Sequence, residues 1–369
     1  RSSAHQRLCP ARFSPPLRHM ILYDSSSWFG LLRFRGSVFP RALCYATPVA
    51  ALATCLKILE VDQGVEIGYV LSMVPNNSVY SGFTFVLSFV LVFRASQSYS
   101  RYWLAAASVH SMQAEWFHAC SSLVAFSKVS KKPSEEVLTF VHTCIRYFCL
   151  LHAMALEEIA DLADLDFPIL DIQSFSKKDL AVLWSEKHEG RKVEVVFQWI
   201  LAYVVKNIDS DLLISPPPLL TRVFQNLSNG LIHYNSAQQV VIWPFPFAYA
   251  QMNGVLLSLY MLITPVIMCN WTNTPWSCGI FTFTSTLCMI GLDLIAIELE
   301  NPFGDDANDL PVREMQCNFN RNLIMLVDPE VWNCPQLLPT ARDHNGLRRT
   351  RTADTMSLHQ YEKVVQRNP

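Results

Sequence analysis

Residues 249–292 read YAQMNGVLLSLYMLITPVIMCNWTNTPWSCGIFTFTSTLCMIGL, and they end a longer segment, residues 223–292, that contains no Asp, Glu, Lys or Arg. A water-facing surface could hardly supply so long an uncharged run, which is instead typical of a membrane protein. About 20 apolar residues cross the hydrocarbon core of a bilayer. We therefore predict two membrane-spanning helices, residues 249–269 and 279–298, joined by a turn with interfacial tryptophans; Asp293 interrupts the second.

Two earlier apolar stretches complete the membrane-spanning set. We predict a first span over residues 43–60 and a second over residues 79–103, which begins after the Pro-Asn-Asn sequence at 75–77. Residues 104–240 include a charged stretch with helical periodicity of apolar side chains, so we expect a water-exposed, cytosolic helical region there. Residues 311–369 turn polar and are expected to form a peripheral segment and a tail. The predicted fold class is an all-α, polytopic membrane protein with four spans.

The composition excludes several classes of protein. Apolar residues make up 51% of the chain and charged residues only 16%, which argues against a fully soluble protein. With 29 basic and 31 acidic residues the net charge is -2, so no excess of positive charge indicates a nucleic-acid-binding protein.

Residues 1–27 form an N-terminal segment whose first twenty residues contain arginines and serines and no acid. This composition is typical of an organelle transit peptide, and also of an ordinary positively charged flank of a membrane span. Both interpretations stay open, and with them an organelle membrane, such as that of a chloroplast or thylakoid, and the plasma membrane.

The sequence offers no obvious catalytic constellation. It contains no His/Cys spacing typical of zinc sites, no Gly-x-Ser-x-Gly motif and no glycine-rich phosphate loop, so we predict that the protein is not an enzyme. Two functions stay open besides transport across the membrane. One is a membrane scaffold or assembly subunit, and the other is a metal-dependent membrane enzyme that uses Asp305, Asp306 and Asp309.

Phe85, Phe89 and Phe93 recur every four residues in the second predicted span, so they form one stripe along a helix (the Phe stripe). Most apolar stripes pack against a neighbouring helix. If several copies of the helix surround an axis, however, the rings form an apolar throat. Such a throat excludes strongly hydrated ions and offers the electropositive ring edges to a partly dehydrated anion.

Short motifs flank the predicted spans. They are RGS at 35–37, FR at 93–94 with YSRYW at 99–103, PFPF at 244–247, and ENPFGDDANDLP at 300–311. In this order and spacing they resemble the bestrophin family, with the PFPF element and the ending of the acidic block closest to its bacterial, algal and plastid-type branch. The resemblance extends from about residue 28 to 329, and we expect the channel domain itself to cover residues 28–310.

The resemblance implies a homopentameric anion channel with four spans in each subunit and one axial pore. Its hydrophobic neck matches Phe85, Phe89 and Phe93, and a second, cytosolic aperture falls in the range Pro218, Leu219 and Leu220. The expected partners are further copies of the chain, the lipid bilayer and permeating anions, chloride or bicarbonate, without a required cofactor. The resemblance also implies that Arg94 forms ion pairs and does not contact the permeating ion.

The acidic block has two interpretations. In calcium-regulated relatives it forms a cation clasp, whose side-chain positions match Asp306 and Asp309. Asp305 precedes the first of these positions, and Asn308 lies between the two. Carboxylates and backbone carbonyls are the ligands that calcium prefers. The alternative is a turn that ends one helix and caps or pairs with the next.

Overall fold

Helices are the only regular elements in the part of the chain that the computed structural model describes, which comprises residues 34, 36–63, 77–160, 167–185, 190–304 and 306–333. The predicted all-α class is therefore confirmed. The chain divides into two units, residues 1–324 and residues 325–369. The second unit contributes the short helix α11 (Pro329–Trp332). The predicted N-terminal segment, residues 1–27, and the tail beyond residue 333 lie outside the described residues.

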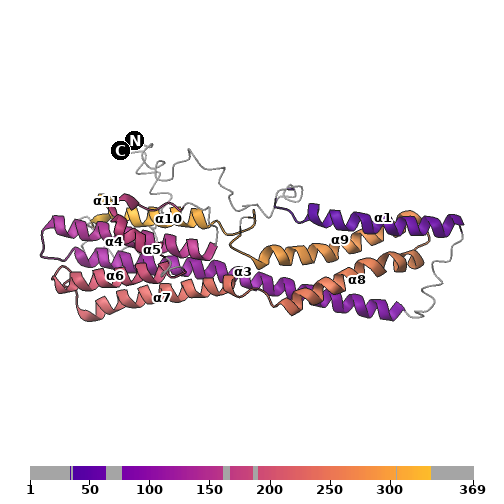
Figure 1. Ribbon diagram of the computed structural model, residues 1–369, viewed down its shortest axis with the longest axis horizontal. Coiled ribbons are helices and arrows are strands. Elements are labelled where there is room, and N and C mark those ends of the chain that lie inside the picture. The colour runs from indigo at the N-terminus through magenta and orange to yellow at the C-terminus, as the bar shows by residue number, and fades with distance from the viewer. Residues whose placement is uncertain are drawn as a thin grey trace, which may run out of the picture. The chain divides into compact units, whose positions relative to one another are not determined.

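Four long helices of the first unit contain the predicted spans (Figure 1). They are α1 (Phe39–Gln63), α3 (Asn77–Ser127), α8 (Phe247–Trp271) and α9 (Pro275–Glu300). Three of them match their predicted bounds to within about one helical turn at each end. In α3 the predicted span is the start of one long helix, which continues without a break 24 residues past residue 103. Its sequence explains this, because residues 104–127 contain no Gly or Pro and alanine-rich sequence favours a helix.

The first half of α3 belongs to one bundle with α1, α8 and α9. Within it, α1 packs against α9 and α8, and both of these also pack against α3. Leu87 and Leu91 of α3 are fully buried in the core that these helices share with Leu257 and Ile290. The helices α8 and α9 therefore separate α1 from α3.

The second half of α3 packs against α4 (Ser134–Ala160) and α7 (Pro217–Ile242), and α4 packs against α6 (Lys192–Asp209) (Figure 1). The closest approach occurs where the fully buried Trp116 lies against Gly230 of α7, since a Cβ atom at Gly230 would lie only 2.2 Å from the Trp116 Nε1 atom. Trp116 Nε1 also donates a hydrogen bond to the Leu227 carbonyl at 3.3 Å. The shorter elements are η3 (Ile172–Ser174), α5 (Lys177–Leu183) and α10 (Val312–Met325).

The described helices include five that are long and apolar enough to cross a membrane, α1, α3, α4, α8 and α9. The sequence prediction had four, because it assigned α4 to the water-exposed region. The structure shows why α4 is so apolar. In its most apolar stretch of 18 residues, 61% is buried inside the chain, against 22–39% in the corresponding stretches of the other four helices. Its apolar residues mostly fill the core of the second bundle.

Candidate functional site

The Phe stripe lies on the face of α3 that the chain itself leaves uncovered. Phe85, Phe89 and Phe93 are 72%, 65% and 39% exposed, whereas Leu87 and Leu91 on the opposite face are fully buried. A helix normally buries its largest apolar side chains in its own core. Phe85 and Phe89 are therefore mostly left uncovered by the described part of this chain, whereas Phe93 is partly covered.

Aromatic rings from α8 and from the segment before it lie beside Phe93, the last residue of the Phe stripe. The Phe93 ring lies 5.9 Å from the ring of Tyr249, measured between centroids, and Tyr249 in turn lies 5.9 Å from the ring of Phe245. Tyr249 belongs to α8, and Phe245 belongs to the PFPF motif just before it. The motif therefore supports the ring of Tyr249, which in turn contacts Phe93.

Arg94, the next residue, joins α3 to α9. Its Nη1 atom donates to Asp293 Oδ1 at 2.8 Å, and its Nη2 atom donates to Glu300 Oε2 at 3.0 Å. The guanidinium carbon also lies 5.7 Å from the centroid of the Phe245 ring. The expectation that Arg94 forms ion pairs is confirmed, and its charge is neutralised at the base of the stripe.

The exposed face of α3 continues beyond the stripe. At 100° per residue, His110 and His118 project on the same side of the helix as Phe85 and Phe93, and both are exposed. This side of the helix thus continues past the Phe stripe through the exposed Trp103 to the two histidines.

The predicted aperture residues occupy the first turn of α7. Pro218 and Leu219 are exposed, whereas Leu220 is buried and belongs to the core of the chain. The turn begins with Pro217 at the first helical position, where a missing N–H has no intrahelical acceptor to lose. Of the two leucines in the predicted aperture range 218–220, only Leu219 is exposed on the surface of the chain.

The acidic block forms a tight turn after α9. The buried carboxylate of Asp309 accepts a hydrogen bond from the Asp306 backbone N–H at 2.6 Å, and a Cβ atom at Gly304 would come within 2.7 Å of that carboxylate. The Asn308 side chain donates to the Gly36 carbonyl at 2.9 Å, and Tyr102 donates to the Asn308 carbonyl at 3.2 Å. The turn thus links α9 to α3 and to the residues before α1.

Within the described residues, no group of three or more Asp, Glu, His or Cys side chains is placed to hold a metal ion. Asp305 lies outside the described residues. The Asp309 carboxylate accepts a hydrogen bond within the turn, which is the contact expected from the capping-turn interpretation of the block.

Two functional contacts escaped the sequence analysis. Asp293 had been only an interruption in a predicted span, because its partner Arg94 lies 199 residues away. Lys57 lies within the first predicted span, and its buried ammonium group donates to the Cys269 carbonyl at 2.8 Å and to Glu60 at 3.1 Å. Only the Lys57–Glu60 pair, at i and i+3, had a local signal in the sequence.

Comparisons with known proteins agree on one family. The family model described as bacterial/fungal bestrophin protein matches residues 20–324. The chain is 26% identical over 308 residues to a voltage-dependent anion channel-forming protein of Synechocystis sp., a match that covers 82% of this chain and 92% of that protein. A protein of the same description from Nostoc sp. is 26% identical over 326 residues, with 86% and 95% covered.

Solved structures show the same fold. A bacterial bestrophin homolog from Klebsiella pneumoniae has a TM-score of 0.62 and 16% sequence identity, covering 79% of this chain and 99% of that chain. Another crystal structure of this homolog gives a TM-score of 0.63 over 79% and 98%. At this identity the likeness concerns the fold.

Proposed function

Because the chain belongs to the bestrophin family, we propose that it is an anion channel that conducts chloride, and also bicarbonate, through one axial pore formed by five copies. It is an integral membrane protein and a channel, not an enzyme. The observation that supports this pore most directly is the exposure of Phe85, Phe89 and Phe93 on a helix whose other face is fully buried.

In this assembly the three rings of each copy converge on the axis and form the neck. The rings recur over eight residues, so the neck is about 12 Å long at 1.5 Å per residue. An apolar wall cannot replace the hydration shell of a small cation, whereas the positive edges of the rings attract a partly dehydrated anion. Selectivity then depends on dehydration, and neutralisation of Arg94 by two carboxylates removes the nearest charged side chain from this role.

The proposed topology has α1, α3, α8 and α9 in the membrane. We place α4 in the cytosolic helical region with α6 and α7, because its apolar face is already occupied by these helices and by α3. The second constriction then lies at the start of α7, where Leu219 is exposed and Leu220 is not.

Calcium has no part in the proposed permeation. The hydrogen bond between the Asp309 carboxylate and the Asp306 N–H supports a structural role for the turn after α9. The composition of residues 1–27 is compatible with an organelle membrane and with the plasma membrane, and imaging of the tagged chain against a plasma-membrane marker distinguishes the two.

Planar bilayer recordings with the purified protein test the proposal. Under a potassium chloride gradient, the reversal potential should lie near the chloride equilibrium potential. Replacing all three phenylalanines by alanine should raise the conductance, whereas Phe281→Ala, which removes an equally exposed ring from α9, should leave it unchanged. Absence of current from the intact pentamer under every condition would favour a scaffold with a sealed axis. A triple variant that conducts like the wild type would refute the neck assignment.

A further inference from the structure

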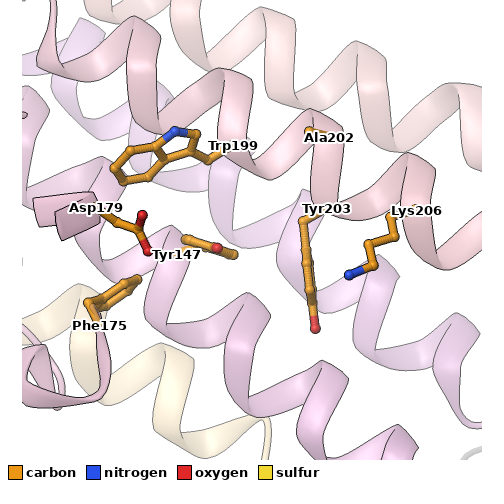
Figure 2. A pocket seen from close by; sticks show the side chains of 7 residues that line it. All are labelled: Tyr147, Phe175, Asp179, Trp199, Ala202, Tyr203 and Lys206. Carbon is orange, nitrogen blue, oxygen red and sulfur yellow. The ribbon is translucent and has the colours of Figure 1, made fainter. Parts of the chain in front are cut away.

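A cavity of about 330 Å³ lies between α4, α5 and α6, far along the chain from the Phe stripe (Figure 2). Its volume is within the range of small-molecule sites, which begins near ~300 Å³. Its walls are mostly aromatic. Four rings and one carboxylate line it, together with one ammonium group, and these residues are Tyr147, Phe175, Trp199, Tyr203, Asp179 and Lys206.

The rings come from separate elements but contact one another. The Tyr147 ring lies 5.7 Å from that of Phe175 and 5.5 Å from that of Tyr203, between centroids. Trp199 and Tyr203 are four residues apart and therefore lie on one face of α6. Burial raises the pKa of the Tyr203 phenol, as expected where the surroundings are poorly hydrated.

The segment that carries Phe175 and Asp179 is held in place. Asp171, at its start, accepts hydrogen bonds from Arg146 Nε at 3.1 Å and Nη2 at 2.7 Å, and Arg146 is the residue next to Tyr147. At the start of α5, the Ser176 side chain accepts from the Lys178 N–H. These contacts connect the segment to α4 beside Tyr147, and such a connection reduces the entropy lost on binding.

The chemistry of these walls favours a positive ligand. The faces of aromatic rings carry negative potential, and an adjacent carboxylate adds to it. In Figure 2 the Asp179 carboxylate points toward the space between Trp199, Tyr147 and Phe175, and the Lys206 ammonium lies on the far side of Tyr203. The positive charge of the lysine is therefore separated from the part of the cavity beside Asp179.

We propose that this cavity is a binding site for a small organic cation, whose ammonium group lies among Tyr147, Phe175, Trp199 and Tyr203 and is paired with Asp179. The site is independent of the proposed pore, because none of its residues belongs to α3. It is a feature of the water-exposed helical region of the channel, and its occupation does not depend on conduction.

Isothermal titration of the purified full-length protein with choline tests the proposal, at constant chloride concentration so that anion binding does not contribute. Choline should bind saturably, and its uncharged isostere dimethylbutanol should not. Asp179→Asn and Trp199→Ala should each weaken choline binding about three- to fivefold, as expected for loss of an exposed ion pair or of a cation–π contact. Lys206→Gln is the matched control and should bind choline at least as tightly as the wild type.

Asp179 is exposed on a short helix, so its replacement should leave the fold intact. Size-exclusion chromatography of each variant is the control for this. Three results would overturn the proposal: no saturable binding of choline to the wild type, equally tight binding of dimethylbutanol, or unchanged choline binding by Asp179→Asn. None of these measurements depends on current, so their failure is distinct from failure of the proposed channel function.

Discussion

Replacing Arg94 by alanine should destabilise the protein far more than replacing Arg41, although both arginines bind carboxylates of α9. The Arg94 side chain is 9% exposed and binds Asp293 and Glu300, whereas the Arg41 side chain is 61% exposed and binds Glu298. Removing one partner of a buried ion pair costs about 3–5 kcal/mol, because the other charge stays buried without compensation. An exposed pair contributes no more than about 1 kcal/mol.

The assay is thermal unfolding of the detergent-solubilised protein, followed by tryptophan fluorescence at one heating rate. From these free energies we expect Arg94→Ala to lower the apparent midpoint by roughly 5–15 °C, and Arg41→Ala by no more than about 3 °C. Arg94→Lys should be intermediate, since a single ammonium group cannot present the two separate donors that bind Asp293 and Glu300.

A double variant separates the charge effect from the loss of packing. In the Arg94→Ala protein, the further change Asp293→Asn removes one of the two carboxylates left without the arginine. It should therefore restore part of the stability, with a coupling free energy of about 1 kcal/mol or more. Equal midpoints for Arg94→Ala and Arg41→Ala, or no recovery in the double variant, would show that the buried ion pairs do not hold α3 to α9.

Four further results are expected. Gly230→Ala should destabilise the protein by about 1–3 kcal/mol, measured by the same unfolding assay, because the added Cβ atom overlaps the buried Trp116 ring. Phe89→Ala alone should raise single-channel conductance about 1.5-fold if the three rings of the neck act as equal resistances in series; a single variant that matches the triple variant would contradict this. Asp309→Asn should lower stability by about 1 kcal/mol, because an amide oxygen accepts the Asp306 N–H less strongly than a carboxylate. Chelation of calcium should leave the wild-type current unchanged, and a lost current would restore the clasp interpretation.

The membrane-spanning helices could be predicted because the bilayer imposes a simple rule on local sequence. A long segment without charge leaves few alternatives, so residues 223–292 placed α8 and the start of α9 to within about a turn. The same rule fails at α4. Its composition satisfies the requirement for a span, and only the helices packed around it show that its apolar face has a protein core to occupy.

The site was less predictable, because its polar contacts join residues far apart in the sequence. The spacing of Phe85, Phe89 and Phe93 is a local property, and it identified one face of α3. By contrast, nothing near Asp293 indicates Arg94, and nothing in the sequence 215–220 distinguishes the exposed Leu219 from the buried Leu220. That difference depends on which face of α7 packs against α3.

Whether an exposed apolar face meets lipid or a pore cannot be read from hydropathy, since both surroundings accept phenylalanine. The packing order within the chain adds what hydropathy lacks. Because α8 and α9 lie between α1 and α3, the exposed faces of α1 and of α3 point in different directions, and only one of them can face a common axis. Exposed residues on α8 are mixed, as at Val255, Leu259 and Leu262, which suits fluid lipid. On α3 exposed valines also occur, but the exposed rings of Phe85, Phe89 and Phe93 recur at a fixed spacing, which copies of the same helix around an axis would turn into rings of phenylalanines. The asymmetry between these faces is therefore the physical reason to assign the axis to α3.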